Sequence, residues 1–400
     1  MSQARGSLSR LVLDFEKSFD TDPDTKNGYI VPFNSFTVAS DRALNTPETI
    51  QNGRAPKAPF DGNIDVAGDA VIPVDLANFW LWLKGLLGTP TTSQESSVNL
   101  DSASATDEDN GLVGLPITDH GLKSGIMVTI TGTENYDGDY EIKEVTTDKI
   151  MIEETYTSES FIFSGSETVQ PKVYDHVFSI ADTLPSMLFE KRFKNPSAVM
   201  KYSKMTGQRL NNMSISMGGD GELTASFNIM GADEILQDSP YDTEGNLNEL
   251  ALQRLHNFQV TLNEGGSALT GTVTTVDLEI TNNLDGDTYT IGNGGKRGDL
   301  VEGVMGISGT INALFNSDAL TLLEHAINAQ ERSLKFSVLD SATNYYKLEI
   351  EMPEVRYGRA TPPVDGPQGV RMSLPFQAYY GDDASIEGLK VTLKNNIETY

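Results

Sequence analysis

The stretch DGNIDVAGDAVIPVDLANFWLWLKGLL occupies residues 61–87, and a related stretch, EGVMGISGTINALFNSDALTLLEHAIN, occupies residues 302–328. The two align without a gap at an offset of 241 residues, which places Gly62 on Gly303 and Gly68 on Gly309. Apolar residues alternate on both sides of the second glycine. This pattern predicts a strand with one buried face, and a bulge or a close backbone approach at the glycine. Upstream, TIQNG at 49–53 aligns with TIGNG at 290–294 at the same offset. We therefore predict two copies of one β unit.

A helix is predicted after each of these strands, because apolar residues then recur at the i, i+3, i+7 spacing of one helix face. Asp75 and Asn316 (or Ser317) stand where the N-caps of the two helices are expected. The residues of the predicted core face are Phe79, Trp82 and Leu86 in the first copy, and Leu320, Leu323 and Ile327 in the second.

The first copy is interrupted by a segment that has no counterpart in the second. This segment begins with the Ser-, Thr- and Asp-rich residues 89–110, which are typical of a flexible linker. Further on, Asn135-Tyr136-Asp137-Gly138-Asp139 predicts a hairpin turn, because an Asp-Gly pair tolerates positive φ. We predict a mainly β chain: residues 1–88 and 172–240 form the first unit, 89–171 a small inserted β domain, and 241–400 the second unit.

The composition narrows the classes of function. With 57 acidic and 29 basic residues the formal charge is -28, which disfavours a protein that grips nucleic acid by neutralising phosphates. The absence of cysteine excludes disulfides and zinc–thiolate sites. The most apolar window, residues 79–87, is too short to span a bilayer, and residues 1–10 show no secretory signal. We expect no membrane partner.

No assembled catalytic, cofactor or metal site is predicted from the sequence. The four histidines (His120, His176, His256 and His325) are scattered and form no ligand pair at metal-binding spacing. The glycine-rich run 292–298 fits neither the dinucleotide-binding nor the P-loop pattern, and a mobile contact loop accounts for it better. We therefore expect no enzyme.

Several segments carry a resemblance to a known family: LVLDFEKSF (11–19), GYIVPFNS (28–35), GNIDVAG (62–68), VDLEITNN (276–283) and LEIEMPEV (348–355). In this order, and together with the duplication, they resemble the tail tube (major tail) proteins of long-tailed, non-contractile bacteriophages (siphophages), of the duplicated type. The predicted insertion has no part in the resemblance.

The resemblance implies that each unit is a β-sandwich or half-barrel with a flanking α-helix. In such proteins the strands of neighbouring subunits join into an inner barrel, and rings stack into the hollow tail tube of the virion. The tape-measure protein and the double-stranded DNA pass through this tube, the DNA without specific binding, and terminator and initiator proteins contact its ends. Because the chain carries two units, the resemblance favours a homotrimeric, pseudo-hexameric ring assembled in the host cytoplasm. A homohexamer is the alternative.

Two loops at equivalent positions, 43–61 and 284–302, are the candidates for contacts between subunits or between rings. Their candidate contact residues are Asn52, Gly53, Arg54 and Lys57 in the first loop, and Asn293, Gly294, Lys296 and Arg297 in the second. The inserted domain is expected on the outside of the tube, and the acidic composition favours a negative lumen along which DNA slides.

Two further classes of protein stay open at this point. One is an acidic multidomain β adhesin or carbohydrate-binding module. The other is the inner tube of another injection system, although the 241-residue repeat argues against it.

Overall fold

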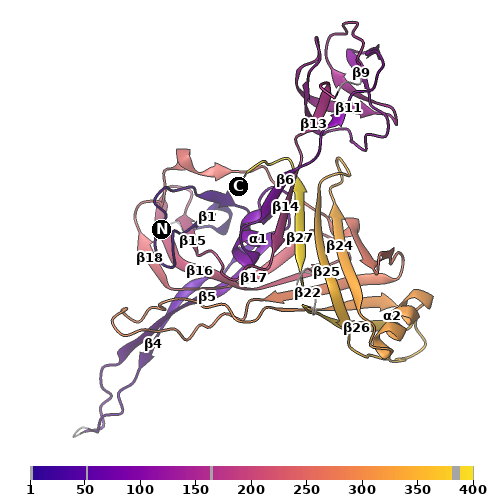
Figure 1. Ribbon diagram of the computed structural model, residues 1–400. Coiled ribbons are helices and arrows are strands. Elements are labelled where there is room, and N and C mark those ends of the chain that lie inside the picture. The colour runs from indigo at the N-terminus through magenta and orange to yellow at the C-terminus, as the bar shows by residue number, and fades with distance from the viewer. Residues whose placement is uncertain (1–2, 51–52, 163–164, 381–387, 400) are drawn as a thin grey trace.

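The computed structural model describes residues 3–50, 53–162, 165–380 and 388–399, and within them the chain is mainly β, which confirms the predicted fold class. One sheet of 20 strands forms the body, and a separate sheet of seven strands lies apart from it (Figure 1). We call residues 3–88 and 172–240 the first half of the body, and residues from 241 onward the second half.

An antiparallel central sheet runs through both halves without interruption. At its second-half end, the last three residues of β25 (Lys347–Tyr357) pair with β26. In spatial order the sheet consists of β4 (Ala39–Asn45), β5 (Phe60–Pro73), β17 (Thr224–Gly231), β16 (Val199–Met217), β22 (Val273–Thr281), β23 (Gly306–Leu314) and β26 (Arg371–Ala378).

A flanking sheet lies behind the central sheet in each half, and the long strands β16 and β25 take part in both layers. In the first half it contains β2 (Tyr29–Val31), β1 (Arg10–Phe15), β15 (Met187–Lys194), the start of β16 and β18 (Asp233–Gln237), with β19 (Asn248–Glu249) parallel to β2. Behind the second half it contains β20 (Val260–Glu264), β24 (Arg332–Leu339), β25 and β27 (Lys390–Asn395). It is extended by the first-half strand β14 (Tyr174–Ser179), which pairs with β27, and by β6 (Thr91–Gln94), which pairs with β14. The short strands β3 (Ser35–Phe36) and β21 (Ser267–Ala268) pair with β5 and β20.

Each half has one α-helix, α1 (Phe79–Leu87) and α2 (Ser317–Ile327), directly after a central strand. Asp75 Oδ1 accepts the N–H groups of Ala77 and Asn78. Asn316 Oδ1 accepts those of Asp318 and Ala319 in the same way. Asn316 therefore caps the start of α2, as predicted. The cap predicted at Asp75 is wrong: α1 begins after Asn78, whose side chain forms no capping bond, and Asp75 instead closes the turn that precedes the helix.

The core lies between the central and flanking layers, and α1 closes it in the first half. The Trp82 ring stacks on Phe189 and Phe227 with centroids 5.6 and 5.1 Å away. The two strand glycines mark close backbone approaches, as predicted. A Cβ atom on Gly68 would lie 2.6 Å from the Val38 backbone, and one on Gly309 would lie 2.3 Å from the Asp277 carbonyl oxygen.

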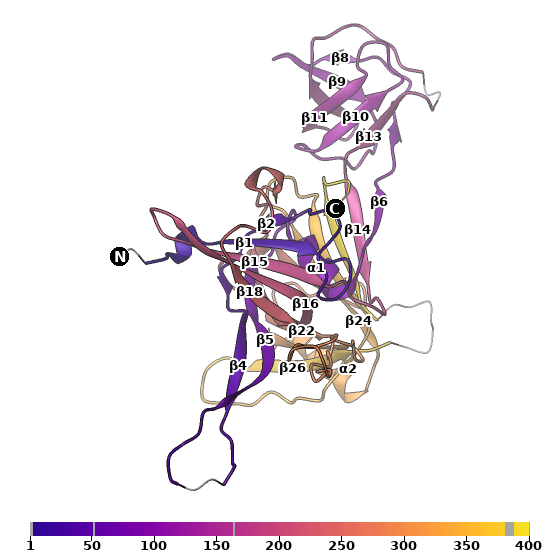
Figure 2. The ribbon, with the colours of Figure 1, turned by 90° about the vertical axis from the view of Figure 1, so that its left-hand side faces the viewer.

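The seven-stranded sheet has its own hydrophobic core and lies at the opposite end of the molecule from the β4–β5 hairpin (Figures 1 and 2). The predicted hairpin turn at residues 135–139 joins β10 and β11. In spatial order the strands are β7 (Val98–Asn99), β13 (Thr168–Pro171), β10 (Met127–Thr131), β11 (Gly138–Val145), β12 (Lys149–Glu153), β9 (Leu112–Pro116) and β8 (Thr106–Asp107).

The flexible linker predicted for residues 89–110 is wrong. β6 pairs with β14 in the body, while β7 and β8 pair within the seven-stranded sheet. Thr and Val favour a pleated conformation once a partner edge is available, and composition alone does not show that edge.

Candidate functional site

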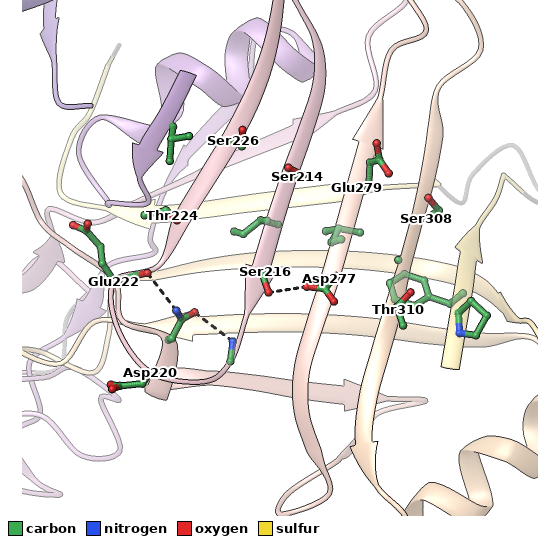
Figure 3. A pocket seen from close by; sticks show the side chains of 18 residues that line it. Ser214, Ser216, Asp220, Glu222, Thr224, Ser226, Asp277, Glu279, Ser308 and Thr310 are labelled. Atoms are coloured by element: carbon green, nitrogen blue, oxygen red, sulfur yellow. Dashed lines mark hydrogen bonds between the residues drawn. The ribbon is translucent and has the colours of Figure 1, made fainter. Parts of the chain in front are cut away.

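The exposed face of the central sheet carries polar side chains from several neighbouring strands. In β16 the alternation buries Met213, Ile215 and Met217 and turns Ser214 and Ser216 outward. Figure 3 shows the neighbouring strands contributing side chains of the same kind to one shallow hollow: Thr224 and Ser226 from β17, Asp277 and Glu279 from β22, and Ser308 and Thr310 from β23.

Carboxylates give this face its charge. Ser216 Oγ donates to Asp277 Oδ1 at 2.7 Å, and Asn312 Nδ2 approaches Asp277 Oδ2 at 3.3 Å. Asn212 Nδ2 donates to Glu279 in the same way. These donors are neutral, so they orient the carboxylates without cancelling their charge. The face is therefore hydroxyl-rich and negative.

One end of the central sheet is the edge of β4. All residues of β4 are exposed. Two side chains of the flanking sheet reach this edge: Glu234 accepts the Ser40 N–H at 2.7 Å, and Lys191 Nζ donates to the Val38 carbonyl at 3.1 Å. Burial alone would raise the pKa of Glu234, but hydrogen bonds from Ser203 and Ser40 outweigh it and the pKa is lowered. Glu234 therefore stays ionised at the edge.

The other end of the central sheet lies beside β26. The Gly358 N–H still bonds to the Pro375 carbonyl at 2.8 Å. Between Gly358 and the start of β26 at Arg371 the chain forms no strand, and most of its residues are exposed. Both ends of the sheet therefore present backbone that another strand can join.

The first candidate loop, 43–61, is the tip of the β4–β5 hairpin, which projects away from the body (Figures 1 and 2). Gly53, Arg54 and Lys57 are exposed there, whereas Asn52 lies outside the described residues. Leu44 and Phe60 add exposed apolar surface to the arm.

The second candidate loop, 284–302, folds against the base of that hairpin. Arg297 is only 5 % exposed. It donates to the carbonyls of Gly231 (2.9 Å) and Gly286 (2.8 Å) and to Asp65 Oδ1 (2.5 Å). Arg297 therefore anchors this loop to the first half of the same chain, and the contact role predicted for the loop stays a prediction.

The other predicted residues of this loop support the same fold. Lys296 Nζ forms an ion pair with Asp233 at 2.6 Å, and this hydrogen bond raises the pKa of Lys296. Asn293 Nδ2 bonds to the carbonyls of Lys296 and Arg297, and the Gly294 carbonyl accepts from Arg42. The sequence offers no signal for this anchoring, since Arg297 and Asp65 lie far apart in the chain.

The residues predicted for the core faces of the two helices differ in their burial. Phe79, Trp82, Leu86 and Leu323 are buried, whereas Leu320 and Ile327 are 45 % and 46 % exposed. The buried side of α2 consists of Ala319, Leu322, Leu323, His325 and Ala326 instead. The predicted core face of the second helix is therefore corrected: α2 lies on the outside of its half, with one side toward solvent.

The histidines have local partners. His176 is fully buried between Thr92 Oγ1 and the Ile397 carbonyl, and burial lowers its pKa. His325 bonds to Glu264 beside α2. No group of three or more metal-ligating side chains is present in the parts of the chain that the structure describes. Within those same parts, no helix has the length and apolarity needed to cross a membrane.

The candidate site is therefore a negative sheet face that ends at the exposed strand β4. The sequence profile of the phage tail tube protein family matches residues 6–378, and the chain therefore belongs to this family. It is a structural protein of the phage tail. Membership of this family favours a non-enzymatic protein that assembles with copies of itself and with other tail proteins. It disfavours the adhesin or carbohydrate-binding alternative. A comparison with curated proteins found no match.

Proposed function

We propose that three copies of the chain close head to tail into a pseudo-hexameric ring, and that these rings stack into the tail tube of a siphophage. The two halves then act as two copies of one tube unit, each with the sheet, flanking layer and helix described above. In the virion the tube would enclose the tape-measure protein and later conduct DNA into the host, after assembly in the host cytoplasm with initiator and terminator proteins.

The pairing of β16 with β22 carries this proposal. β16 belongs to the first half and β22 to the second, and their antiparallel register sets Met213 opposite Ile280 and Ile215 opposite Leu278. One joint between halves therefore exists inside the chain. If the halves are copies, the same joint can form between the second half of one chain and the first half of the next.

The strand that would receive this joint is β4. Gly309 of β23 lies opposite Leu278 of β22, and Gly68 of β5 lies against Val38 just before β4. Since Gly68 and Gly309 are equivalent at the 241-residue offset, Val38 corresponds to Leu278. The outer edge of β4 is therefore equivalent to the edge of β22 that pairs with β16.

The strand that would supply the joint is the end of β25. Phe376 lies opposite Gly309 and Ile229 lies opposite Gly68, so these two residues are equivalent. Tyr357 pairs with Phe376 and Leu210 pairs with Ile229, so Tyr357 takes the place of Leu210 of β16. Because β16 meets β22 from Asn212 onward, the residues directly after Tyr357 would continue the strand and face β4 of the next chain.

The negative face of the central sheet is the proposed lumen wall. Besides Asp277 and Glu279, β5 turns Asp65 and Asp69 toward the same side. Such a wall gives passing DNA none of the counterion-release attraction that a basic surface creates. The β4–β5 hairpin is the proposed contact to the adjacent ring, and the seven-stranded sheet the proposed decoration on the tube exterior.

Negative-stain electron microscopy of the purified chain over a concentration series tests the proposal, with the symmetry taken from end-on views. We expect hollow rings or stacked tubes with three outer knobs per ring, one for each seven-stranded sheet. Six knobs would replace the trimer by the homohexamer. Closed particles without a channel, persisting after the initiator is added, would overturn the tube itself.

A further inference from the structure

The outward side of α2 carries a stripe of Leu320, Glu324 and Ile327, spaced i, i+4, i+7. The two aliphatic side chains are nearly half exposed in the single chain, and Glu324 between them is exposed as well. Apolar side chains aligned on one exposed helix face are typical of a surface that becomes covered by a partner.

The equivalent stripe of α1 is buried within the chain. At the 241-residue offset Phe79, Leu83 and Leu86 take the places of the three α2 residues, and each is at most 1 % exposed. The second half helps to cover α1, because Asn282 Nδ2 donates to the Leu86 carbonyl at 3.1 Å, and β14, a first-half strand that joins the second flanking sheet, also packs on the helix. The joint between halves therefore covers a helix as well as a strand edge.

We propose that the α2 stripe docks on the first-half flank of a second copy of this chain, against Leu236 and Lys201. This inference rests on the head-to-tail ring proposed above, and it identifies a contact of that ring outside the shared sheet. Leu320 and Ile327 supply the apolar contact with Leu236, while Glu324 meets Lys201.

The first-half flank has the chemistry that the stripe requires. Leu236 of β18 is 63 % exposed, and the β16–β18 register places it on the same side as Lys201. Lys201 forms an ion pair with the exposed Asp238 at 2.5 Å, and such a surface ion pair is easily exchanged. On the same side, Glu234 reaches the β4 edge. The docking surface is therefore continuous with the proposed strand joint.

Charge and position both favour a second copy as the occupant. In a chain of net charge -28, the side of the β15–β16 hairpin that carries Leu236 also carries the basic residues Lys191 and Lys201. The outward side of α2 is acidic by contrast. Figure 1 shows β18 and α2 at opposite sides of the body, as a head-to-tail contact requires.

Disulfide trapping tests the contact, because the natural chain has no cysteine. The double variant L236C/I327C, oxidised at concentrations where the unmodified chain forms rings, should give disulfide-linked oligomers up to the trimer on a non-reducing gel. The matched control I162C/I327C uses an exposed residue of the seven-stranded sheet and should stay monomeric. The double variant L236C/L320C repeats the test at the other aliphatic residue of the stripe, two helix turns from Ile327.

Charge reversal provides a second readout. E324K and K201E should each raise the concentration needed for ring assembly about fivefold, and the double variant K201E/E324K should return it toward the unmodified value. Both positions are exposed, so the thermal unfolding of the single chain should not change. If the unmodified chain forms rings, but the cysteine variants give no linked oligomers and the charge-reversed double variant does not recover assembly, the α2 contact is overturned and the ring is not. Trapped oligomers from a chain that never forms rings would support the contact and overturn the ring.

Discussion

Replacing Arg297 by methionine tests whether one buried side chain holds the 284–302 loop and the β4–β5 hairpin together. Methionine keeps the approximate length of the side chain and removes the guanidinium group. The carbonyls of Gly231 and Gly286, together with that of Val66 at 3.3 Å, then lose their donor in a buried position. Each buried acceptor without a partner costs about 1 kcal/mol or more, so R297M should lower the free energy of unfolding by about 3 kcal/mol.

The control separates these carbonyl contacts from the ion pair. Asp65 is mostly exposed, so D65N should cost less than about 1 kcal/mol although it removes the same salt bridge. Urea unfolding followed by tryptophan fluorescence gives both values, and limited proteolysis reports cleavage within 284–302. An R297M chain within about 0.5 kcal/mol of the natural one, with the loop still protected, would refute the anchoring role.

Three further predictions concern stability and assembly. Burial raises the pKa of Glu16 to about 7, so the folded state holds this proton more tightly than the unfolded state. The contribution of Glu16 to stability should therefore be full below about pH 4.5 and fall by up to roughly 3 kcal/mol as the pH rises to 7. In a urea-unfolding series E16Q should remove this contribution, and a pH dependence unchanged by E16Q would contradict it. G68A should destabilise by several kcal/mol because its Cβ would meet the Val38 backbone, whereas G369A, which meets nothing within 4 Å, should be nearly neutral in thermal unfolding. Replacing residues 46–59 by a two-residue Asn-Gly turn should leave rings intact but prevent stacking in electron micrographs, and long tubes from this variant would remove the hairpin from the axial contact.

The local pattern around the paired glycines could be predicted because it depends on near neighbours. Alternation predicted the strand through Gly68 and helical spacing predicted the helix after it, all within about twenty residues. The hairpin at Asp137-Gly138 follows from the same kind of short-range rule. Each of these depends on backbone geometry that the residues themselves impose.

The parts that sequence reasoning missed depend on which surfaces meet in three dimensions. Alternation and helical spacing cannot show that the second flanking sheet encloses α1 while α2 faces outward. For this reason the spacing predicts a buried side for Leu320 and Ile327, which are exposed in the structure. Loop composition could not show that Arg297 turns inward toward carbonyls of the first half. Residues 89–110 look like a linker until the edges of β14 and β9 are available to pair with them.

The β4 edge explains how a chain with open strands can persist before assembly. Glu234 and Lys191 already bond to the Ser40 N–H and the Val38 carbonyl, so two of the groups that a foreign strand would use are occupied. In the proposed ring these bonds give way to backbone bonds from the next chain, an exchange that is close to neutral since each hydrogen bond is worth about 1 kcal/mol net. The drive for closure must then come from the surfaces beside the edge, where Leu320, Ile327 and Leu236 lose contact with water. On this reasoning, substitutions at the helix stripe shift ring assembly more than substitutions in the strand that forms the joint.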